Sequence, residues 1–166
     1  MNTSETKNKG AVKGGNGNYI FDLAGLQRMD AGVGYSSAEG PVVEGERIQV
    51  GLISMKRGTG ARAHTHPNEQ WIYLMKGKGR VSVDGQPERI AGPGTLIYLP
   101  ANIVHYIQAL PEEDVLFFTC KDMSHGIIGM AADGTMAGPY VDPGIGASKN
   151  DDFVKSKFPP PLAGGD

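Results

Sequence analysis

The residues most suited to chemistry in this sequence are histidines that recur at short spacing. His64 and His66 are two positions apart, so both imidazoles point to the same face of an extended strand. His105 lies in a later strand-like segment. Two imidazoles from one strand and a third from another can hold a divalent ion and leave coordination positions open. The spacing therefore predicts a metal site, with ordinary surface histidines as the alternative.

The residues around these histidines resemble the two sequence motifs of the cupin superfamily. The first motif reads G-x5-H-x-H-x3or4-E-x6-G, and this chain follows its spacing with Gly58, His64, His66, Gln70 and Gly77. The second motif reads G-x5-P-x-G-x2-H-x3-N, and the corresponding residues are Gly94, Pro100, Asn102, His105 and Ala109. Asn102 replaces a glycine, and asparagine also tolerates a positive φ. The resemblance covers about residues 42–121.

Gln70 stands where most cupins carry a glutamate that binds the metal. The resemblance implies that Gln70 is a ligand through its side-chain oxygen, beside His64, His66 and His105. Three neutral imidazoles and a neutral amide would leave a divalent ion with its full charge, which favours substrates that bring negative charge. This donor set contains no thiolate, and it suits iron or manganese as well as nickel, zinc or copper. We therefore expect one divalent metal ion as the cofactor.

Short strand-like segments fill the middle of the chain, and its 25 glycines and 11 prolines provide turn signals between them. This pattern predicts an all-β domain, either a small sandwich or a barrel. The resemblance narrows the prediction to a single cupin-type β-barrel, also called a double-stranded β-helix or jelly roll. Gly77 and Gly85 lie in two expected hairpin turns. The expected strands are residues 47–55, 70–76, 80–83, 95–99, 103–110 and 115–120.

The two ends of the chain differ from this pattern. Residues 1–18 are polar and rich in Lys, Asn and Gly, which predicts a disordered tail before a barrel at residues 19–125. A short helix is expected at residues 22–30, although Gly25 weakens it. Residues 126–166 form a Gly/Pro-rich C-terminal extension with too many breaks for long regular elements. Its apolar side chains could cover the barrel or a partner subunit; they are Ile127, Ile128, Met130, Phe153 and Phe158.

The composition argues against several classes of protein. Sixteen Lys and Arg against 18 Asp and Glu give a formal charge of −2, without the basic surface that nucleic-acid binding requires. The single cysteine, Cys120, excludes a disulfide framework. The sequence has neither an apolar run of membrane-spanning length nor a secretion signal. We expect a cytoplasmic protein that forms a homodimer through outward-facing residues; the candidates are Trp71, Tyr73, Met75 and residues 127–130.

The same strand periodicity selects candidate residues around the metal. If Gln70 points inward, Ile72 and Leu74 do so too, and Ile107 follows from His105. Such an apolar pocket suits a small organic substrate, although these residues fit a plain hydrophobic core equally well. Arg62 shares a face with His64 if the strand is regular, so it could bind a substrate carboxylate. Tyr98 could supply a hydroxyl near the site, with packing or a subunit contact as its alternative.

These observations predict a metal-dependent enzyme acting on a small carbonyl, diol or carboxylate compound. The motifs contain no obvious general base, so hydrolysis is disfavoured and oxygenative, dioxygenase-like cleavage is the leading reaction. An oxygen-independent isomerase or lyase of sugar acids or keto acids is the alternative. A non-catalytic cupin that binds a small ligand is the third reading, because one fold can host many functions.

Overall fold

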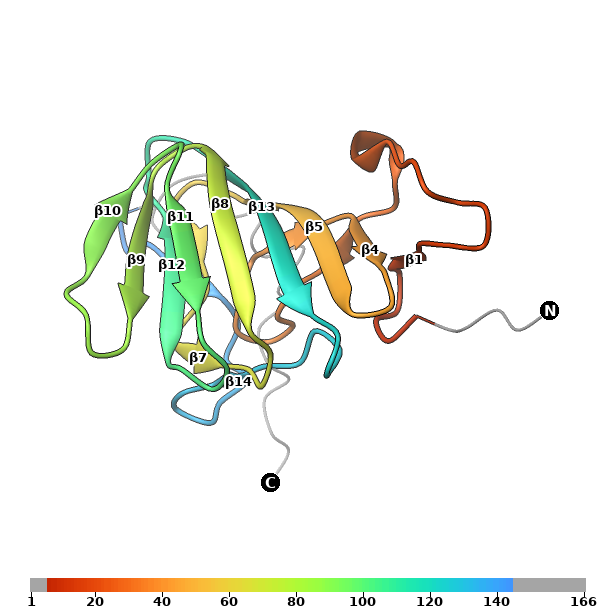
Figure 1. The fold of residues 1–166 in the computed structure, drawn as a ribbon. Coiled ribbons are helices and arrows are strands. Elements are labelled where there is room, and N and C mark those ends of the chain that lie inside the picture. Colours follow the sequence, from red (N-terminus) through yellow and green to blue (C-terminus); the bar gives the residue numbers. More distant parts are fainter. Residues whose placement is uncertain (1–5, 145–166) are drawn as a thin grey trace, which may run out of the picture.

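The computed structural model describes residues 6–144, which form two β-sheets with the hydrophobic core between them (Figure 1). The first sheet has the strand order β1-β4-β5-β13-β8-β11, with β2 and β3 attached to β5. Its strands are β1 (Val12–Lys13), β2 (Met29–Asp30), β3 (Glu39–Gly40), β4 (Val42–Glu44), β5 (Ile48–Met55), β8 (Gln70–Lys76), β11 (Leu96–Leu99) and β13 (Val115–Asp122).

The second sheet has the order β10-β9-β12-β6-β15, and β7 joins it by pairing with β12 and β14. Its strands are β6 (Thr59–Gly60), β7 (His64–Thr65), β9 (Gly79–Val83), β10 (Arg89–Ala91), β12 (His105–Ala109), β14 (Met130–Ala131) and β15 (Tyr140–Val141). The all-β prediction is therefore confirmed. Each of the six expected strands is present, and its bounds differ from the expected ones by no more than two residues.

Between β8 and β13 the chain crosses from one sheet to the other at every connection except the β9–β10 hairpin, which corrects one predicted turn. The sequence predicts a hairpin at Gly77, but β8 belongs to the first sheet and β9 to the second. Gly77 has φ +76°, and a Cβ atom there would come within 2.3 Å of the Asp114 carbonyl oxygen. The turn at Gly77 thus carries the chain across the barrel. The turn at Gly85 does form a hairpin, because β9 and β10 pair antiparallel.

Alternating burial along the strands builds the core as expected. In β8 the side chains of Ile72 and Leu74 are buried, while Trp71, Tyr73 and Met75 are exposed. The inner faces of both sheets contribute to one hydrophobic cluster. Residues 22–30 do not form the expected helix; only a 3-10 turn at Leu23–Gly25 (η1) is present. No helix among the described residues is long and apolar enough to span a membrane.

The N-terminal segment is ordered where the structure describes it, contrary to the disorder predicted for residues 1–18. Strand β1 pairs in parallel with β4, and the Asn8 side chain is buried. The reason is the fully buried carboxylate of Glu44, which accepts hydrogen bonds from the backbone N–H groups of Lys7 and Asn8 at 2.8 and 2.9 Å. A buried carboxylate needs such donors, and residues 7 and 8 supply them.

The C-terminal extension covers its own barrel over residues 126–144. Strand β14 pairs with β7, and β15 pairs with β6. These pairs are only two residues long, as expected from the glycines and prolines of the segment. Phe153 and Phe158 lie outside the described residues. The three-part division into residues 1–18, 19–125 and 126–166 otherwise stays a prediction.

Candidate metal centre

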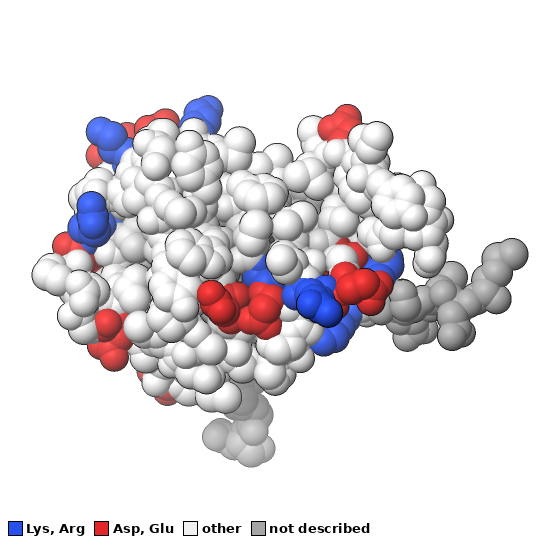
Figure 2. Space-filling view, in the orientation of Figure 1, with Lys and Arg blue, Asp and Glu red and all other residues white. Residues whose placement is uncertain are grey.

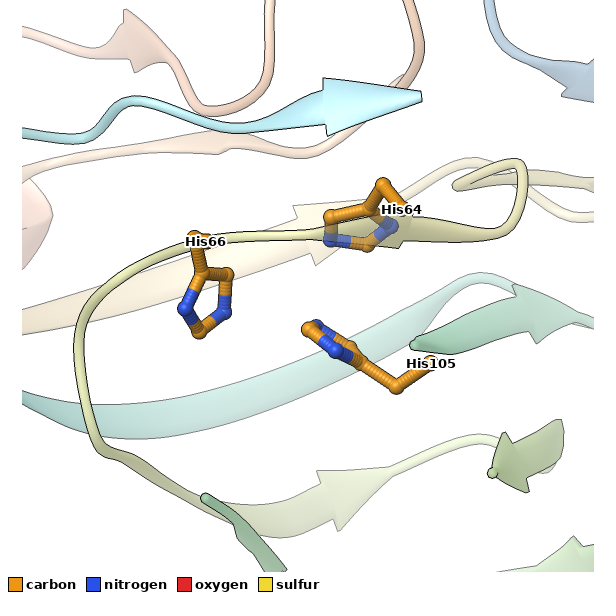
Figure 3. A group of neighbouring side chains, drawn as sticks. All are labelled: His64, His66 and His105. Atoms are coloured by element: carbon orange, nitrogen blue, oxygen red, sulfur yellow. The ribbon is translucent and has the colours of Figure 1, made fainter. Parts of the chain in front are cut away.

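Strand pairing brings the three predicted histidines together. His64 on β7 and His105 on β12 are register partners on neighbouring antiparallel strands, and their ring centroids lie 4.2 Å apart. His66 follows β7 directly, with its ring centroid 4.7 Å from that of His105. Figure 3 shows the three imidazoles around a common space. One nitrogen from each ring lies within 4.8 Å of the others, so a single ion could bind all three.

Backbone hydrogen bonds fix which nitrogen of each ring is available. The Nδ1 atoms of His64, His66 and His105 lie 2.8, 2.9 and 3.0 Å from the carbonyl oxygens of residues 62, 68 and 103. A carbonyl can only accept, so each Nδ1 carries the proton and each Nε2 presents its lone pair. The Nε2 of His66 is buried without a hydrogen-bond partner among the described residues. This arrangement fits a metal, because metal-bound histidines usually donate their second N–H in the same way.

The electrostatics of the cluster keep the imidazoles neutral. Burial, with a smaller effect from the charge of His105, lowers the pKa of His64 to about 3. Burial also lowers the pKa of His66 to about 3, assisted by the nearby charges of Lys121 and His105. The pKa of His105 falls to about 4, again mainly through burial. Neutral imidazoles are the form that binds metals, so the cluster needs no deprotonation near neutral pH.

Asn102 links the two histidine segments. Its φ of +64° confirms the left-handed conformation expected where the motif has glycine. Its backbone N–H donates to the carbonyl oxygen of His66 at 2.8 Å. This hydrogen bond connects the loop that precedes His105 to the loop that follows His64.

Gln70 begins β8 and lines the same cavity as the histidines. The hydroxyl of Thr119 donates to the Trp71 carbonyl oxygen at 2.9 Å, so its oxygen accepts the Nε2–H of Gln70 at 2.8 Å. This contact occupies the amide nitrogen and leaves the amide oxygen of Gln70 for another partner. Coordination by that oxygen remains a prediction.

The cavity beside the histidines has a volume of about 80 Å³. Since a water molecule needs about 10–15 Å³ on this measure, the cavity suits a small organic molecule. Ile72 and Ile107 line it, as predicted. Leu74 points inward, but it is fully buried in the core and does not line the cavity.

Two predicted substrate residues, Arg62 and Tyr98, do not line this cavity. Arg62 precedes β7, so the regular strand assumed for it is absent. Its guanidinium binds the C-terminal extension, through Asp133, the side chain and carbonyl of Thr135, and the Gly138 carbonyl. Tyr98 is the register partner of Trp71 and shares its outward orientation, with the two ring centroids 4.5 Å apart. Tyr98 therefore packs on the outer surface.

The structure adds polar residues to the cavity that the sequence analysis does not name, among them Tyr35, Lys121 and Gln49. Tyr35 packs against His64, with ring centroids 4.5 Å apart, and burial raises the pKa of its hydroxyl to about 12. Lys121 lies on β13, and burial lowers the pKa of its ammonium to about 8. Gln49 on β5 also lines the cavity. The alternation in β13, extended past residue 120, could have indicated Lys121, whereas no sequence signal places the loop residue Tyr35.

Comparisons with known proteins agree with this architecture. Residues 51–120 match the cupin domain family. The fold is similar to that of an RmlC-like cupin from Shewanella frigidimarina, at 16% identity over 63% of this chain and 89% of that chain, with a TM-score of 0.53. It is also similar to the fold of the DMSP lyase DddQ from Ruegeria pomeroyi, at 18% identity over 57% of this chain and 47% of that chain, with a TM-score of 0.51.

A cupin-like protein from Thermotoga maritima matches at 28% identity over 53% of this chain and 65% of that chain, with a TM-score of 0.46. The chain spans about half the length of DddQ, covering 47% of it. No curated protein sequence matches the chain.

The matched region contains both histidine segments and runs from β5 to β13. The chain therefore carries a cupin domain, and its two sheets form the double-stranded β-helix of that family. The three buried histidines at its centre could bind a metal ion.

Proposed function

We propose that this protein is a metal-dependent enzyme that moves a proton on a small organic anion, as a lyase or isomerase does. The observation that carries the proposal is the pairing of a three-histidine cluster with the buried ammonium of Lys121 in one cavity. The charge of Lys121 lowers the pKa of all three histidines, so it acts on the same space that they enclose. A cavity with this charge favours an anionic substrate.

The residues of the chain have separate tasks in this proposal. A divalent ion, when bound, would act as a Lewis acid that polarises a carbonyl or carboxylate oxygen of the substrate. Lys121 stabilises the negative charge that develops when a solvent water molecule accepts the substrate's C–H proton. Tyr35 has its hydroxyl protonated near neutral pH, since burial raises its pKa to about 12, and it can donate a proton. The apolar side chains of Ile72 and Ile107 restrict water at the reacting atoms.

Oxygenative cleavage is the second candidate. Three neutral nitrogen donors with open coordination positions favour it, because oxygen-using iron sites share these features. The sequence favours oxygenative cleavage partly because its motifs contain no obvious general base. Lys121 and Tyr35 place acid–base groups in the cavity, so this reason no longer applies. Proton transfer is therefore the better supported reaction.

The two reactions differ in their need for oxygen and in what happens in D₂O. The protein should be loaded separately with iron(II), manganese(II), nickel(II) or zinc(II) and incubated with small keto acids, hydroxy acids and uronates, with His66→Ala as the control. Exchange of a substrate C–H for deuterium, at equal rates with and without oxygen, would support proton transfer. Turnover that consumes oxygen would replace it with oxygenative cleavage. Binding without exchange or turnover for any metal would indicate a ligand-binding cupin.

A further inference from the structure

A row of polar side chains crosses the inner face of the first sheet, on the cavity wall contributed by β5, β13 and β8. Lys121 is the register partner of Gln49 on β5 and of Gln70 on β8. Register partners on antiparallel strands point to the same face, and all three side chains line the cavity that the histidines share. The row therefore places a cation between two amides inside an otherwise largely apolar barrel.

Lys121 forms no close ion pair within residues 6–144, although the charge of the neighbouring Asp122 partly offsets the effect of burial on its pKa. The residue is 8% exposed, and no hydrogen bond or ion pair reaches its Nζ atom in that part of the chain. Asp122 is the neighbouring acid, but its carboxylate accepts hydrogen bonds from Ser124 and from the backbone N–H of Glu69. A buried ammonium without a counter-ion costs free energy, and a bound anion would offset that cost.

Gln49 presents a second unused donor to the same space. The residue is 2% exposed, and its Nε2 atom is buried without a hydrogen-bond partner among the described residues. The orientation of the amide is fixed from behind, because Asn8 Nδ2 donates to Gln49 Oε1 at 2.7 Å. The Nε2 atom is therefore the end of the side chain that remains free.

Asn8 is itself held in one orientation by its neighbours. Its Nδ2 group has two protons, which go to Gln49 Oε1 and to Glu44 Oε1, each at 2.7 Å. Its Oδ1 atom accepts the backbone N–H of Ile127. A chain of hydrogen bonds thus runs from the buried carboxylate of Glu44 through Asn8 to Gln49. The N-terminal segment and the C-terminal extension both fix the direction of the Gln49 amide.

We propose that Lys121 Nζ and Gln49 Nε2 together bind the carboxylate of a small organic acid, and that Asn8 is a positioning residue for this pair. The role of this subsite in catalysis rests on the proposed function: it would bind the substrate carboxylate and direct the other end of the substrate to the histidines. Its ability to bind an anion does not depend on that function. The cavity of about 80 Å³ suits the carboxylate end of a small organic acid.

The subsite can be tested on the metal-free protein with acetate as the probe, so turnover is not needed. Binding is measured by ¹³C NMR or calorimetry at about pH 7.5, where acetate is ionised. Lys121→Met removes the charge while keeping most of the side chain's volume, and Lys76→Met changes an exposed lysine on β8 as the control. Acetate should bind at least about tenfold more weakly to Lys121→Met, since a hydrogen bond to a charged group is lost.

Thermal unfolding separates this binding role from a structural one. Removing an unpartnered buried ammonium should raise the melting temperature of the metal-free Lys121→Met protein. A lower melting temperature together with unchanged acetate binding would overturn the subsite. Equal acetate affinity in Lys121→Met and Lys76→Met would overturn it as well.

Gln49→Glu gives a second test that preserves shape. The new carboxylate still accepts from Asn8, but it also pairs with Lys121 and repels an anion, so acetate binding should be lost. Gln86→Glu adds the same charge at an exposed position and should leave acetate binding unchanged. Asn8→Ala allows the Gln49 amide to rotate, so it should weaken acetate binding, but less than Gln49→Glu does. Undiminished acetate binding in Gln49→Glu would contradict the proposal.

These measurements keep the two proposals apart. Acetate binding that depends on Lys121 and Gln49, without proton exchange in any metal-loaded form, would uphold the subsite and overturn the proposed lyase or isomerase. Metal-dependent exchange on a keto acid that survives Lys121→Met with an unchanged KM would uphold the enzyme and overturn the subsite.

Discussion

His64 and His105 are direct partners across β7 and β12, and their ring centroids are 4.2 Å apart. The separation of the two imidazoles is therefore set by backbone pairing between strands. His66 lies just beyond β7, where the strand turns toward Asn68, and it completes the cluster from a loop. Strand pairing sets the positions of His64 and His105, whereas a loop positions His66. Substitution of each ligand then tests its own contribution to metal binding.

His66→Ala should abolish stoichiometric metal binding and leave a folded β protein. Only two strand histidines would remain, together with Gln70, and the imidazole removed has a buried Nε2 with no other partner among the described residues. Metal content of the purified protein, compared with its circular dichroism spectrum, checks this prediction. Full metal occupancy in the variant would show that the ion does not bind at this cluster.

Gln70→Glu should bind the metal more tightly and act more slowly on an anionic substrate. A carboxylate adds attraction for the ion but lowers its net charge, which weakens its pull on a negatively charged ligand. The substitution also removes the Nε2–H that Thr119 accepts at 2.8 Å, so the loss of that contact needs a control. Thr119→Val removes the same contact and keeps the amide. If Gln70→Glu left activity unchanged, Gln70 would not be a ligand.

The metal-free protein should lose stability as the pH falls below about 6.5. The folded-state pKa values of His64, His66 and His105 lie at about 3, 3 and 4, below the ordinary value of 6.5. Between these values the unfolded chain binds more protons than the folded one, so the free energy of unfolding decreases as the pH decreases. The slope can reach about 1.4 kcal/mol per pH unit for each histidine.

Urea denaturation between about pH 5 and pH 7 checks this prediction, because most carboxyl groups stay ionised in that range. His66→Ala should show a shallower slope than the unchanged protein. Stability that does not change over this interval would mean that the imidazoles are not held neutral in the folded state.

The histidine cluster could be predicted from sequence because His64 and His66 follow a local spacing and the resemblance to the cupin motifs added His105. The two-residue spacing of His64 and His66 is a property of one extended segment, and Asn102 occupies a turn whose positive φ only a few residue types adopt. The alternation that buries Ile72 and exposes Trp71 is equally local. These features need no knowledge of how distant segments pair.

The rest of the cavity depends on pairing that the sequence does not encode locally. Lys121 and Gln49 are neighbours because β13 lies beside β5 in one register, and Asn8 reaches Gln49 because the N-terminal segment packs along β4. Arg62 lies away from the cavity because the strand expected to carry it begins two residues later, at His64. The sequence predicts a hairpin at Gly77 because a tight turn has the same sequence pattern whether the chain stays in one sheet or crosses to the other.

The outer face of the first sheet should form a homodimer interface. Trp71, Tyr73 and Met75 are exposed on β8, and Leu96 and Tyr98 continue this apolar surface onto the edge strand β11. Figure 2 shows few charged side chains over much of the face that carries β8 and β13. An apolar patch beside an edge strand is commonly covered by another subunit.

We expect sedimentation at micromolar concentration to give a dimer, and Trp71→Glu to shift the protein toward the monomer. Metal binding should survive this change, because Trp71 points away from the cavity that Gln70 lines. Ile90→Glu is the matched control, since it places the same charge on an exposed apolar residue of the other sheet, on β10, and should leave the dimer intact. A monomer of 17.6 kDa for the unchanged protein would rule out this interface.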